Sequence, residues 1–378
     1  VVDLPKDVLF AEGPYYAPNG NEHPSYKPQV KGDESAIERA VDLLAKAKRP
    51  IFYGGGGLIN AGPKASKLYA ELVRLTQAPT TLTLMGLGAY PSQDRQFLGM
   101  LGMHGTYEAN LAMYNCDVMI NIGARFDDRV TKGYKANSKP LEKWWAQIEK
   151  WRERKCLAFT EDSSIIKPQH AIKRLYELTR DRDTYITTEV GQHQMWAAQY
   201  FGFEEPNRWM TSGGLGTMGY GLPAAMGVQI AHPDSTVIDI AGEASYLMNI
   251  QELSTLAQYR LPVKSFIVNN QWMGMVRQWQ ELNHGGRYSE SYSESLPDFI
   301  KVAEAFGGVG LRAETVDQLD DVIMEMLETD RFVLADIMVK KDENCFPMIP
   351  SGAAHYEMLL GPDDKAELET SENGMVLV

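Results

Sequence analysis

Apolar residues recur along this chain in two patterns, a helical spacing of three to four positions and short continuous runs bounded by glycine or proline. The first pattern predicts amphipathic helices, and the second predicts buried strands. The predicted helices cover residues 35–46, 63–76, 107–114 and 140–154. The predicted strands cover residues 50–53, 80–84, 117–122, 185–188, 236–241, 263–268, a short stretch near 309, and 332–338. Because strands alternate with helices, we expect an α/β fold with two doubly wound parallel-sheet domains.

Changes in composition divide the chain into five segments. Residues 1–31 are rich in Pro, Gly, Tyr and Asn and predict a linker, with residues 1–8 resembling a buried strand that leads into it. Residues 32–135 form a first α/β domain with three strands, and no later strand completes its sheet, so we expect an open edge. Residues 136–167 predict a helical linker, residues 168–350 a second α/β domain, and residues 351–378 an acidic, irregular tail.

Charge and cysteine content restrict the possible partners. The 378 residues carry a formal net charge of −13, which argues against nucleic acid or an anionic membrane as a partner. The longest apolar runs are shorter than the roughly 18 residues that a membrane span needs. Three cysteines without metal-binding spacing suit a reducing compartment, and we expect a cytoplasmic protein. An anionic cofactor would need local neutralisation by a metal ion or by backbone amides.

The most informative stretch begins at residue 238, where a strand, a Gly242-Glu243 turn, a helix and a second strand ending on Asn269 and Asn270 follow one another. A right-handed unit of this kind places both turns at the carboxyl ends of neighbouring parallel strands. Glu243 and Asn270 could then give two oxygen ligands to one Mg²⁺ ion beside a bound diphosphate, since Mg²⁺ takes few protein oxygens together with phosphate oxygens and water.

Two further loops are expected at the same edge of the sheet. A glycine-rich run, residues 213–219, precedes a helix that begins near Leu222, and such loops let a ligand approach the backbone. Tight packing of helix on sheet explains the glycines equally well. His193 follows the preceding strand and, taken alone, is typical of a structural histidine. Three loops at one sheet edge favour a ligand site over packing.

Several motifs together resemble one family. Gly242-Glu243-Ala244-Ser245, followed by Asn270 27 positions after the acid, resembles the motif of thiamine-diphosphate enzymes. Residues 191–199, 211–221, 274–280, 101–105 and 123–130 are similar to motifs of the acetolactate synthase (acetohydroxyacid synthase) large catalytic subunit. The resemblance implies that residues 32–135 are a truncated middle domain of the FAD-binding type and residues 168–350 the thiamine-diphosphate-binding domain. It covers nearly the whole chain except about 132–140.

The resemblance also implies a role for individual residues. Glu243, Asn270 and the backbone carbonyl of Trp272 would bind Mg²⁺. The diphosphate cofactor would be held by Val190, Gln192, His193, Gly216, Met218, Gly242, Ala244, Ser245 and Met275. Met248 would face the reacting carbon, and Trp279, with Val276, would shape the pocket of the second substrate. Gly102, Met103, His104, Gly105 and Arg125 would contact FAD.

The implied reaction is decarboxylation of pyruvate and condensation with a second 2-keto acid, pyruvate or 2-ketobutyrate, the first common step of branched-chain amino acid biosynthesis. The cofactor's thiazolium would act as the electron sink. A homodimer or homotetramer, and a small regulatory subunit, are implied as partners. Two alternatives stay open: a catalytically silent cofactor-binding fragment, and another thiamine-diphosphate decarboxylase or carboligase.

The sequence departs from the family pattern in three places. Glu243 stands where the family has Asp, so the metal-binding carboxylate reaches one methylene further. Nothing in this sequence matches the motif of the family's amino-terminal domain, whose glutamate protonates the pyrimidine of the cofactor, and we expect Glu189 to be structural. Without that acid a loss of several powers of ten in rate is expected. The middle domain stops after Val130, so we expect FAD binding to be weak or lost.

Overall fold

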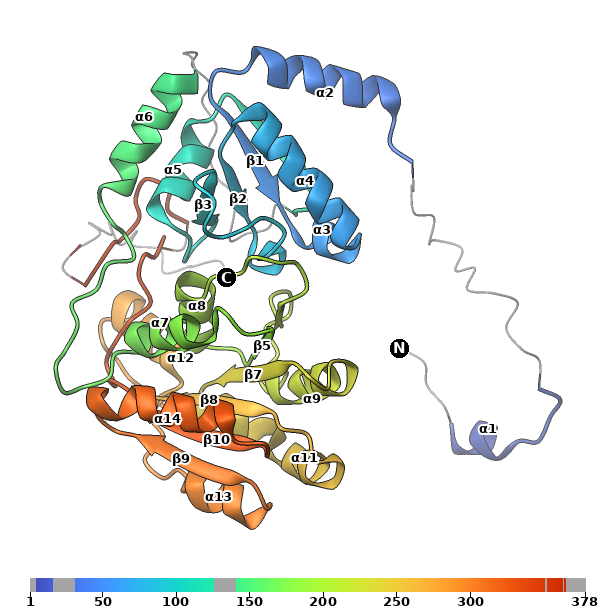
Figure 1. The fold of residues 1–378 in the computed structure, drawn as a ribbon, viewed down its shortest axis with the longest axis vertical. Coiled ribbons are helices and arrows are strands. Elements are labelled where there is room, and N and C mark those ends of the chain that lie inside the picture. Colours follow the sequence, from blue (N-terminus) through green and yellow to red (C-terminus); the bar gives the residue numbers. More distant parts are fainter. Residues whose placement is uncertain (1–4, 16–30, 126–140, 351, 363, 365–378) are drawn as a thin grey trace. The chain divides into compact units, whose positions relative to one another are not determined.

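The computed structural model describes residues 5–15, 31–125, 141–350, 352–362 and 364 (Figure 1). It divides into two compact units, residues 1–45 and 46–378, each of which is described by itself. Much of the predicted linker, residues 126–130 of the last family motif, the polar stretch 132–139 and most of the acidic tail lie outside the described residues. No helix in the described ranges is long and apolar enough to cross a membrane.

The first unit contains two helices in its described part, α1 (Lys6–Phe10) and nearly all of α2 (Glu34–Lys46). The helix expected at 35–46 is therefore confirmed. The buried strand expected at residues 1–8 is wrong over its described part, because residues 6–10 are helical and Val8 is 57% exposed. Pro5 is the N-cap of that helix, and the described part of this unit offers no strand with which a β-strand could pair.

The smaller sheet has four parallel strands in the order β3-β2-β1-β4. They are β1 (Pro50–Gly54), β2 (Thr80–Leu82), β3 (Phe97–Met100) and β4 (Val118–Ile122), joined by α3 (Gly56–Asn60), α4 (Pro63–Thr76), the 3₁₀ turn η1 (Leu84–Gly86) and α5 (Tyr107–Asn115). The sequence predicted three of these strands and missed β3, a four-residue strand that contains Gly99 with φ +93°. The last residue of the strand expected at 80–84 lies in η1 instead.

Helix α6 (Leu141–Arg152) packs on this sheet, although the sequence placed it in a linker. Trp144 and Ile148 are buried in one apolar cluster with Ile51 of β1 and Leu98 of β3. The indole Nε1 of Trp144 donates to the carbonyl of Pro50 at 3.1 Å. The helix therefore contributes to the core of the smaller sheet.

The larger sheet has six parallel strands in the order β6-β5-β7-β8-β10-β9 (Figure 1). They are β5 (Thr184–Thr188), β6 (Trp209–Thr211), β7 (Thr236–Ala241), β8 (Lys264–Asn269), β9 (Val309–Ala313) and β10 (Val333–Met338). Five of them were expected, and β6 was missed because it has only three residues. The two parallel sheets confirm the predicted fold class.

Helices cover both faces of the larger sheet. Helices α9 (Gly221–Ala231), α11 (Leu253–Tyr259) and α13 (Phe299–Ala305) bury one face around Val237, Ile267 and Leu334. Helices α7 (Pro168–Thr179), α8 (Gln192–Tyr200) and α14 (Val316–Glu328) lie on the other. The short helices α10 (Glu243–Tyr246) and η2 (Leu247–Glu252) follow β7, and α12 (Gly274–Asn283) follows β8.

Strand order reverses direction between β5 and β7, because the chain moves outward from β5 to β6 and then returns to the other side of β5. In open α/β sheets the loops on either side of such a reversal leave a crevice at the carboxyl ends of the strands. The loops after β5, β7 and β8 therefore meet at one place.

Candidate cofactor site

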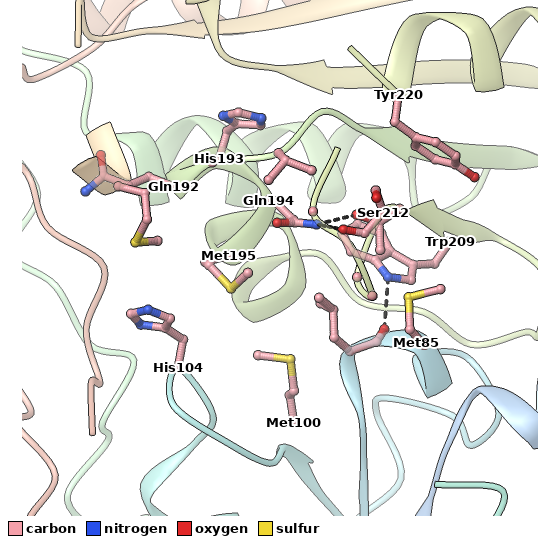
Figure 2. Close-up of a pocket in the computed structure, with 18 of the residues that line it drawn as sticks. Met85, Met100, His104, Gln192, His193, Gln194, Met195, Trp209, Ser212 and Tyr220 are labelled. Carbon is pink, nitrogen blue, oxygen red and sulfur yellow. Dashed lines mark hydrogen bonds between the residues drawn. The ribbon is translucent and has the colours of Figure 1, made fainter. Parts of the chain in front are cut away.

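A cavity of about 920 Å³ lies where the carboxyl edge of the larger sheet faces the loops of the smaller one. Figure 2 shows Met85, Met100 and His104 on the side of the smaller sheet, and Gln192, Gln194 and Met195 of α8 opposite them. A volume of this size accommodates a ligand as large as a cofactor.

Most of the predicted site residues line this one cavity. They are Val190, Gln192, His193, Gly216, Met218, Gly242, Glu243, Ala244, Ser245, Asn270, Trp272, Met275, Val276, Gly102, Met103, His104 and Arg125. They come from loops up to 174 positions apart in the sequence, so only the fold brings them together.

Three predicted residues do not line the cavity. Met248 lies on η2 with 51% of its surface exposed, and Trp279 lies further along α12 than the cavity-lining turn. Gly105 lies in the turn after β3, where an added Cβ would come 2.4 Å from the carbonyl oxygen of Met100. Gly105 therefore shapes the turn that carries His104, while the roles given to Met248 and Trp279 stay predictions.

The carboxylate of Glu243 lies at the centre of the proposed metal site. Its side chain is 1% exposed, and Oε1 has no hydrogen-bond partner among the described residues. Burial raises the pKa of this carboxyl to about 8, against the opposing effect of nearby backbone amides, including those of Asn270 and Trp272. A buried carboxylate oxygen without a partner is costly, and a bound cation would supply the missing interaction.

Of the paired asparagines, only Asn270 lines the cavity. Because successive residues of a strand point to opposite faces, Asn269 turns the other way and its Nδ2 donates to Asp336 at 2.8 Å. The Oδ1 atom of Asn270 accepts from the backbone N–H of Trp272 at 3.0 Å and keeps a second lone pair. The described residues contain no group of three or more His, Cys, Asp or Glu that could hold a metal. The oxygen donors present therefore suit a hard cation completed by phosphate and water, such as Mg²⁺.

His193 lies beside Glu243 in a space that two glycines leave open. An added Cβ on Gly242 would come 2.7 Å from the imidazole Nδ1, and one on Gly191 would come 2.8 Å from Cε1. Burial lowers the pKa of His193 to about 3, so the ring is neutral, and its Nε2 has no partner in the described part of the chain. A neutral ring with an unpaired nitrogen facing the cavity suits hydrogen bonding to a ligand.

The glycine-rich loop is held from behind by Glu189. The Glu189 carboxylate is fully buried and accepts from the backbone amides of Gly219 at 2.5 Å and Leu222 at 3.1 Å. Gly216 and Gly219 have φ of +76° and +87°, which side chains with a Cβ rarely adopt. These contacts agree with the structural role expected for Glu189, and they set the path of the loop that carries Met218 along the cavity.

Some cavity residues were not singled out from the sequence. Met85, Met100 and Met195 bring apolar side chains, and Trp209 joins the two sheet layers by donating from Nε1 to the carbonyl of Leu84 at 3.0 Å (Figure 2). Gln194 donates to Thr211 Oγ1 at 2.6 Å and so ties α8 to β6. Met195 and Gln194 lie inside the 191–199 motif, so the sequence could have identified them as cavity residues. No motif of the sequence includes Met85 or Met100.

Comparison with known proteins places this site in a class. Residues 37–150 match the family described as "Thiamine pyrophosphate enzyme, central domain", and residues 189–337 match "Thiamine pyrophosphate enzyme, C-terminal TPP binding domain". The fold and the cavity are thus those of a thiamine-diphosphate enzyme with two of its characteristic domains.

Comparison with individual proteins identifies one family within this class of enzymes. The chain is 42% identical to the acetolactate synthase isozyme 3 large subunit of Escherichia coli K12, over 97% of this chain and 72% of that protein. It is 42% identical to the acetolactate synthase large subunit of Haemophilus influenzae, over 95% of this chain and 71% of that protein, and 36% identical to that of Cyanidium caldarium, over 95% and 70%. The chain belongs to the family of acetolactate synthase large subunits.

The alignment with the Escherichia coli protein is longer than this chain. It extends over 419 positions with the Escherichia coli protein, 41 more than the 378 residues of this chain. At least that many positions of the relative therefore fall inside the matched region without a counterpart here. An internal shortening relative to this family member is thus established.

Proposed function

We propose that this chain is an acetolactate synthase catalytic chain that depends on thiamine diphosphate and Mg²⁺. It would convert two pyruvate molecules into one acetolactate and one CO₂, or join a pyruvate-derived two-carbon unit to 2-ketobutyrate. The observation that carries the proposal is the buried Glu243 oxygen, which has no hydrogen-bond partner among the described residues. It lies in a cavity that gathers the predicted cofactor residues, in a chain of this family.

We assign the roles of the cavity residues from their positions. Glu243, Asn270 and the Trp272 carbonyl would hold Mg²⁺, and the metal would neutralise the diphosphate in a chain with a net charge of −13. Gln192, the neutral His193, Gly242, Ala244 and Ser245 would line the diphosphate. Thiamine diphosphate supplies the electron sink for decarboxylation.

The rest of the cavity would orient the substrates and exclude water. Gly216 would offer its carbonyl to the cofactor's amino group, and Met218 would support the cofactor's bent form. Val190 would face the reacting carbon, and Met275 and Val276 would shape the pocket of the acceptor 2-keto acid, beside the apolar Met85 and Met195. A dry pocket protects a reactive carbon from protonation before the second substrate adds.

The test pairs activity with binding. Acetolactate formation from pyruvate is measured with thiamine diphosphate and Mg²⁺, and cofactor binding is followed by calorimetry. Glu243→Gln keeps the shape but removes the charge, so Mg²⁺-dependent cofactor binding should be lost. Glu243→Asp, which restores the carboxylate of the family pattern, should retain it. Equal Mg²⁺ dependence in the unaltered chain and in Glu243→Gln would refute the metal site.

The same experiment addresses the silent-fragment alternative. A folded chain that binds thiamine diphosphate with Mg²⁺ but forms no acetolactate would be a cofactor-holding portion of the enzyme and not a complete catalyst. Formation of acetaldehyde in place of acetolactate would indicate another decarboxylase of the same superfamily.

For FAD we propose weak or lost binding. Gly102, Met103, His104 and Arg125 line the cavity and could contact part of a flavin, but the chain lacks at least 41 aligned positions of its relative. Purified chain should therefore show little flavin absorbance near 450 nm unless FAD is added in excess. Stoichiometric flavin in the purified protein would contradict this.

We also propose assembly into a homodimer or homotetramer, and association with a small subunit, because the relatives are named large subunits. Light scattering of the purified chain measures the first. A strictly monomeric mass at micromolar concentration would rule it out.

A further inference from the structure

Three side-chain amides form a hydrogen-bonded chain behind the proposed metal site. Asn270 Nδ2 donates to Gln192 Oε1 at 3.2 Å, and Gln192 Nε2 donates to Gln278 Oε1 at 2.9 Å. All three side chains are buried, with exposed fractions of 5%, 3% and 0%. Gln278, the innermost member, does not line the cavity.

Backbone N–H groups at both ends of this row of three side-chain amides determine which way each amide is oriented. The N–H of Cys345 donates to Gln278 Oε1 at 2.8 Å, and the N–H of Trp272 donates to Asn270 Oδ1 at 3.0 Å. A backbone N–H can only donate, so each end requires an oxygen at that place. The two ends impose the same orientation on all three amides, and the oxygen of Asn270, not its NH₂ group, is held toward Trp272.

Gln278 also controls the second acceptor of the Gln192 amide. Besides Gln278, Gln192 Nε2 donates to the carbonyl of Glu343 at 3.1 Å. Glu343 lies two residues before Cys345, and Cys345 is bonded to Gln278 twice. Its N–H donates to Gln278 Oε1, and its carbonyl accepts from Gln278 Nε2 at 3.1 Å. Loss of the Gln278 amide would therefore remove one acceptor of Gln192 and release the segment that supplies the other.

We propose that Gln278 is a positioning residue that, through Gln192, keeps the amide oxygen of Asn270 available to the metal ion. The inference rests on the proposed function, since the orientation of Asn270 matters for binding only if a cation sits beside it. An amide turned the other way presents N–H groups, which cannot ligate a cation. Partners that orient metal ligands in this manner typically contribute 10–100-fold to metal affinity.

The test compares substitutions of two buried glutamines, Gln278 and Gln229. Gln278→Met removes the amide at similar volume. Gln278→Glu keeps an oxygen that accepts from Cys345 and Gln192. Gln229→Met is the matched control, because Gln229 is 1% exposed in α9 and donates only to carbonyls at residues 232, 233 and 235, before β7 begins and away from its carboxyl end.

The readouts are Mn²⁺ affinity by electron paramagnetic resonance, with thiamine diphosphate present, and thermal stability by calorimetry. Gln278→Met should raise the Kd for Mn²⁺ by about 10–100-fold. Gln278→Glu should bind Mn²⁺ nearly as tightly as the unaltered chain. Gln229→Met should lose stability and keep its Mn²⁺ affinity. If the role of Gln278 were purely structural, Gln278→Met would behave like this control and would also keep its Mn²⁺ affinity.

Unchanged Mn²⁺ affinity in folded Gln278→Met would overturn the proposal, and so would an equal loss in Gln229→Met. Should Gln278→Met not fold, Gln278→Asn takes its place: its amide is one methylene too short to reach both Cys345 and Gln192, and unchanged affinity would again overturn the proposal. No Mn²⁺ binding by the unaltered chain would instead overturn the metal site itself, and the positioning role with it.

Discussion

Gly242, the residue before Glu243 of the proposed metal site, is predicted to be intolerant of even one added methyl group. Its backbone, with φ −101° and ψ 154°, suits alanine, so no backbone strain is involved. The obstacle is His193: an added Cβ would lie 2.7 Å from Nδ1 and 2.9 Å from Cε1. The ring is buried and cannot move outward into solvent.

The size of the effect follows from two opposing contributions. Overpacking of a buried site costs about 1–3 kcal/mol. Replacing glycine by alanine restricts the unfolded chain and returns about 0.4–1 kcal/mol. We therefore expect Gly242→Ala to destabilise the protein by about 1–2 kcal/mol, or a few degrees in Tm. If the ring relieves the contact by moving into the cavity, the affinity for thiamine diphosphate falls about tenfold, the equivalent of 1.4 kcal/mol.

Calorimetry with and without thiamine diphosphate and Mg²⁺ measures both effects. Gly227→Ala is the matched control, because Gly227 lies in α9 with no atom within 4 Å of the added Cβ. It should stabilise the chain by about 0.5–1 kcal/mol and leave cofactor affinity unchanged. The reasoning is refuted if Gly242→Ala is as stable as Gly227→Ala and binds the cofactor equally well.

Three further predictions follow from buried polar groups. Trp209→Phe leaves the part-buried Leu84 carbonyl without this donor and should cost about 0.5–1.5 kcal/mol in urea unfolding; no change would show that the link between the sheets is dispensable. Burial lowers the pKa of Lys264 from 10.5 to about 8, so the cost of its charge is fully present below pH 8. Between pH 8 and 10.5 the folded state loses this proton before the unfolded state does, so stability should rise. The rise should be smaller than the roughly 3 kcal/mol of the full shift, because Nζ also donates to the carbonyls of Thr329 and Arg331. Lys264→Met should lack that rise, and parallel pH profiles of the two chains would contradict it. Burial also raises the pKa of the three thiols, which belong to Cys116, Cys156 and Cys345. A thiol reagent at pH 8 should therefore modify none of them before the protein unfolds. Rapid labelling of the native chain would contradict their burial.

Much of the fold follows from local pattern. The helix at 63–76 and the strand at 236–241 have the bounds that their periodicity predicts. The strands β3 and β6 were missed, because three or four residues carry too little pattern to be separated from a loop, and only pairing with neighbours makes them strands. Helix α6 was assigned to a linker, since an amphipathic pattern reports that a face is buried but not against what.

The site divides in the same way. The Gly242-Glu243 turn and the Asn269-Asn270 pair are short motifs at strand ends, so the sequence by itself determined that a cofactor edge exists and which loops form it. Which asparagine faces the cavity depends on the pleat of β8. The amide of Asn270 accepts from the N–H of Trp272 and is linked through Gln192 and Gln278 to Cys345, 75 positions further along the chain. Met248 was assigned to the site from the resemblance, but its side chain on η2 is 51% exposed and does not line the cavity. Local patterns specify elements and loops because neighbours in sequence share one backbone geometry. The orientation of buried polar groups was decided only by the tertiary structure, because their partners come from segments that the fold alone brings together.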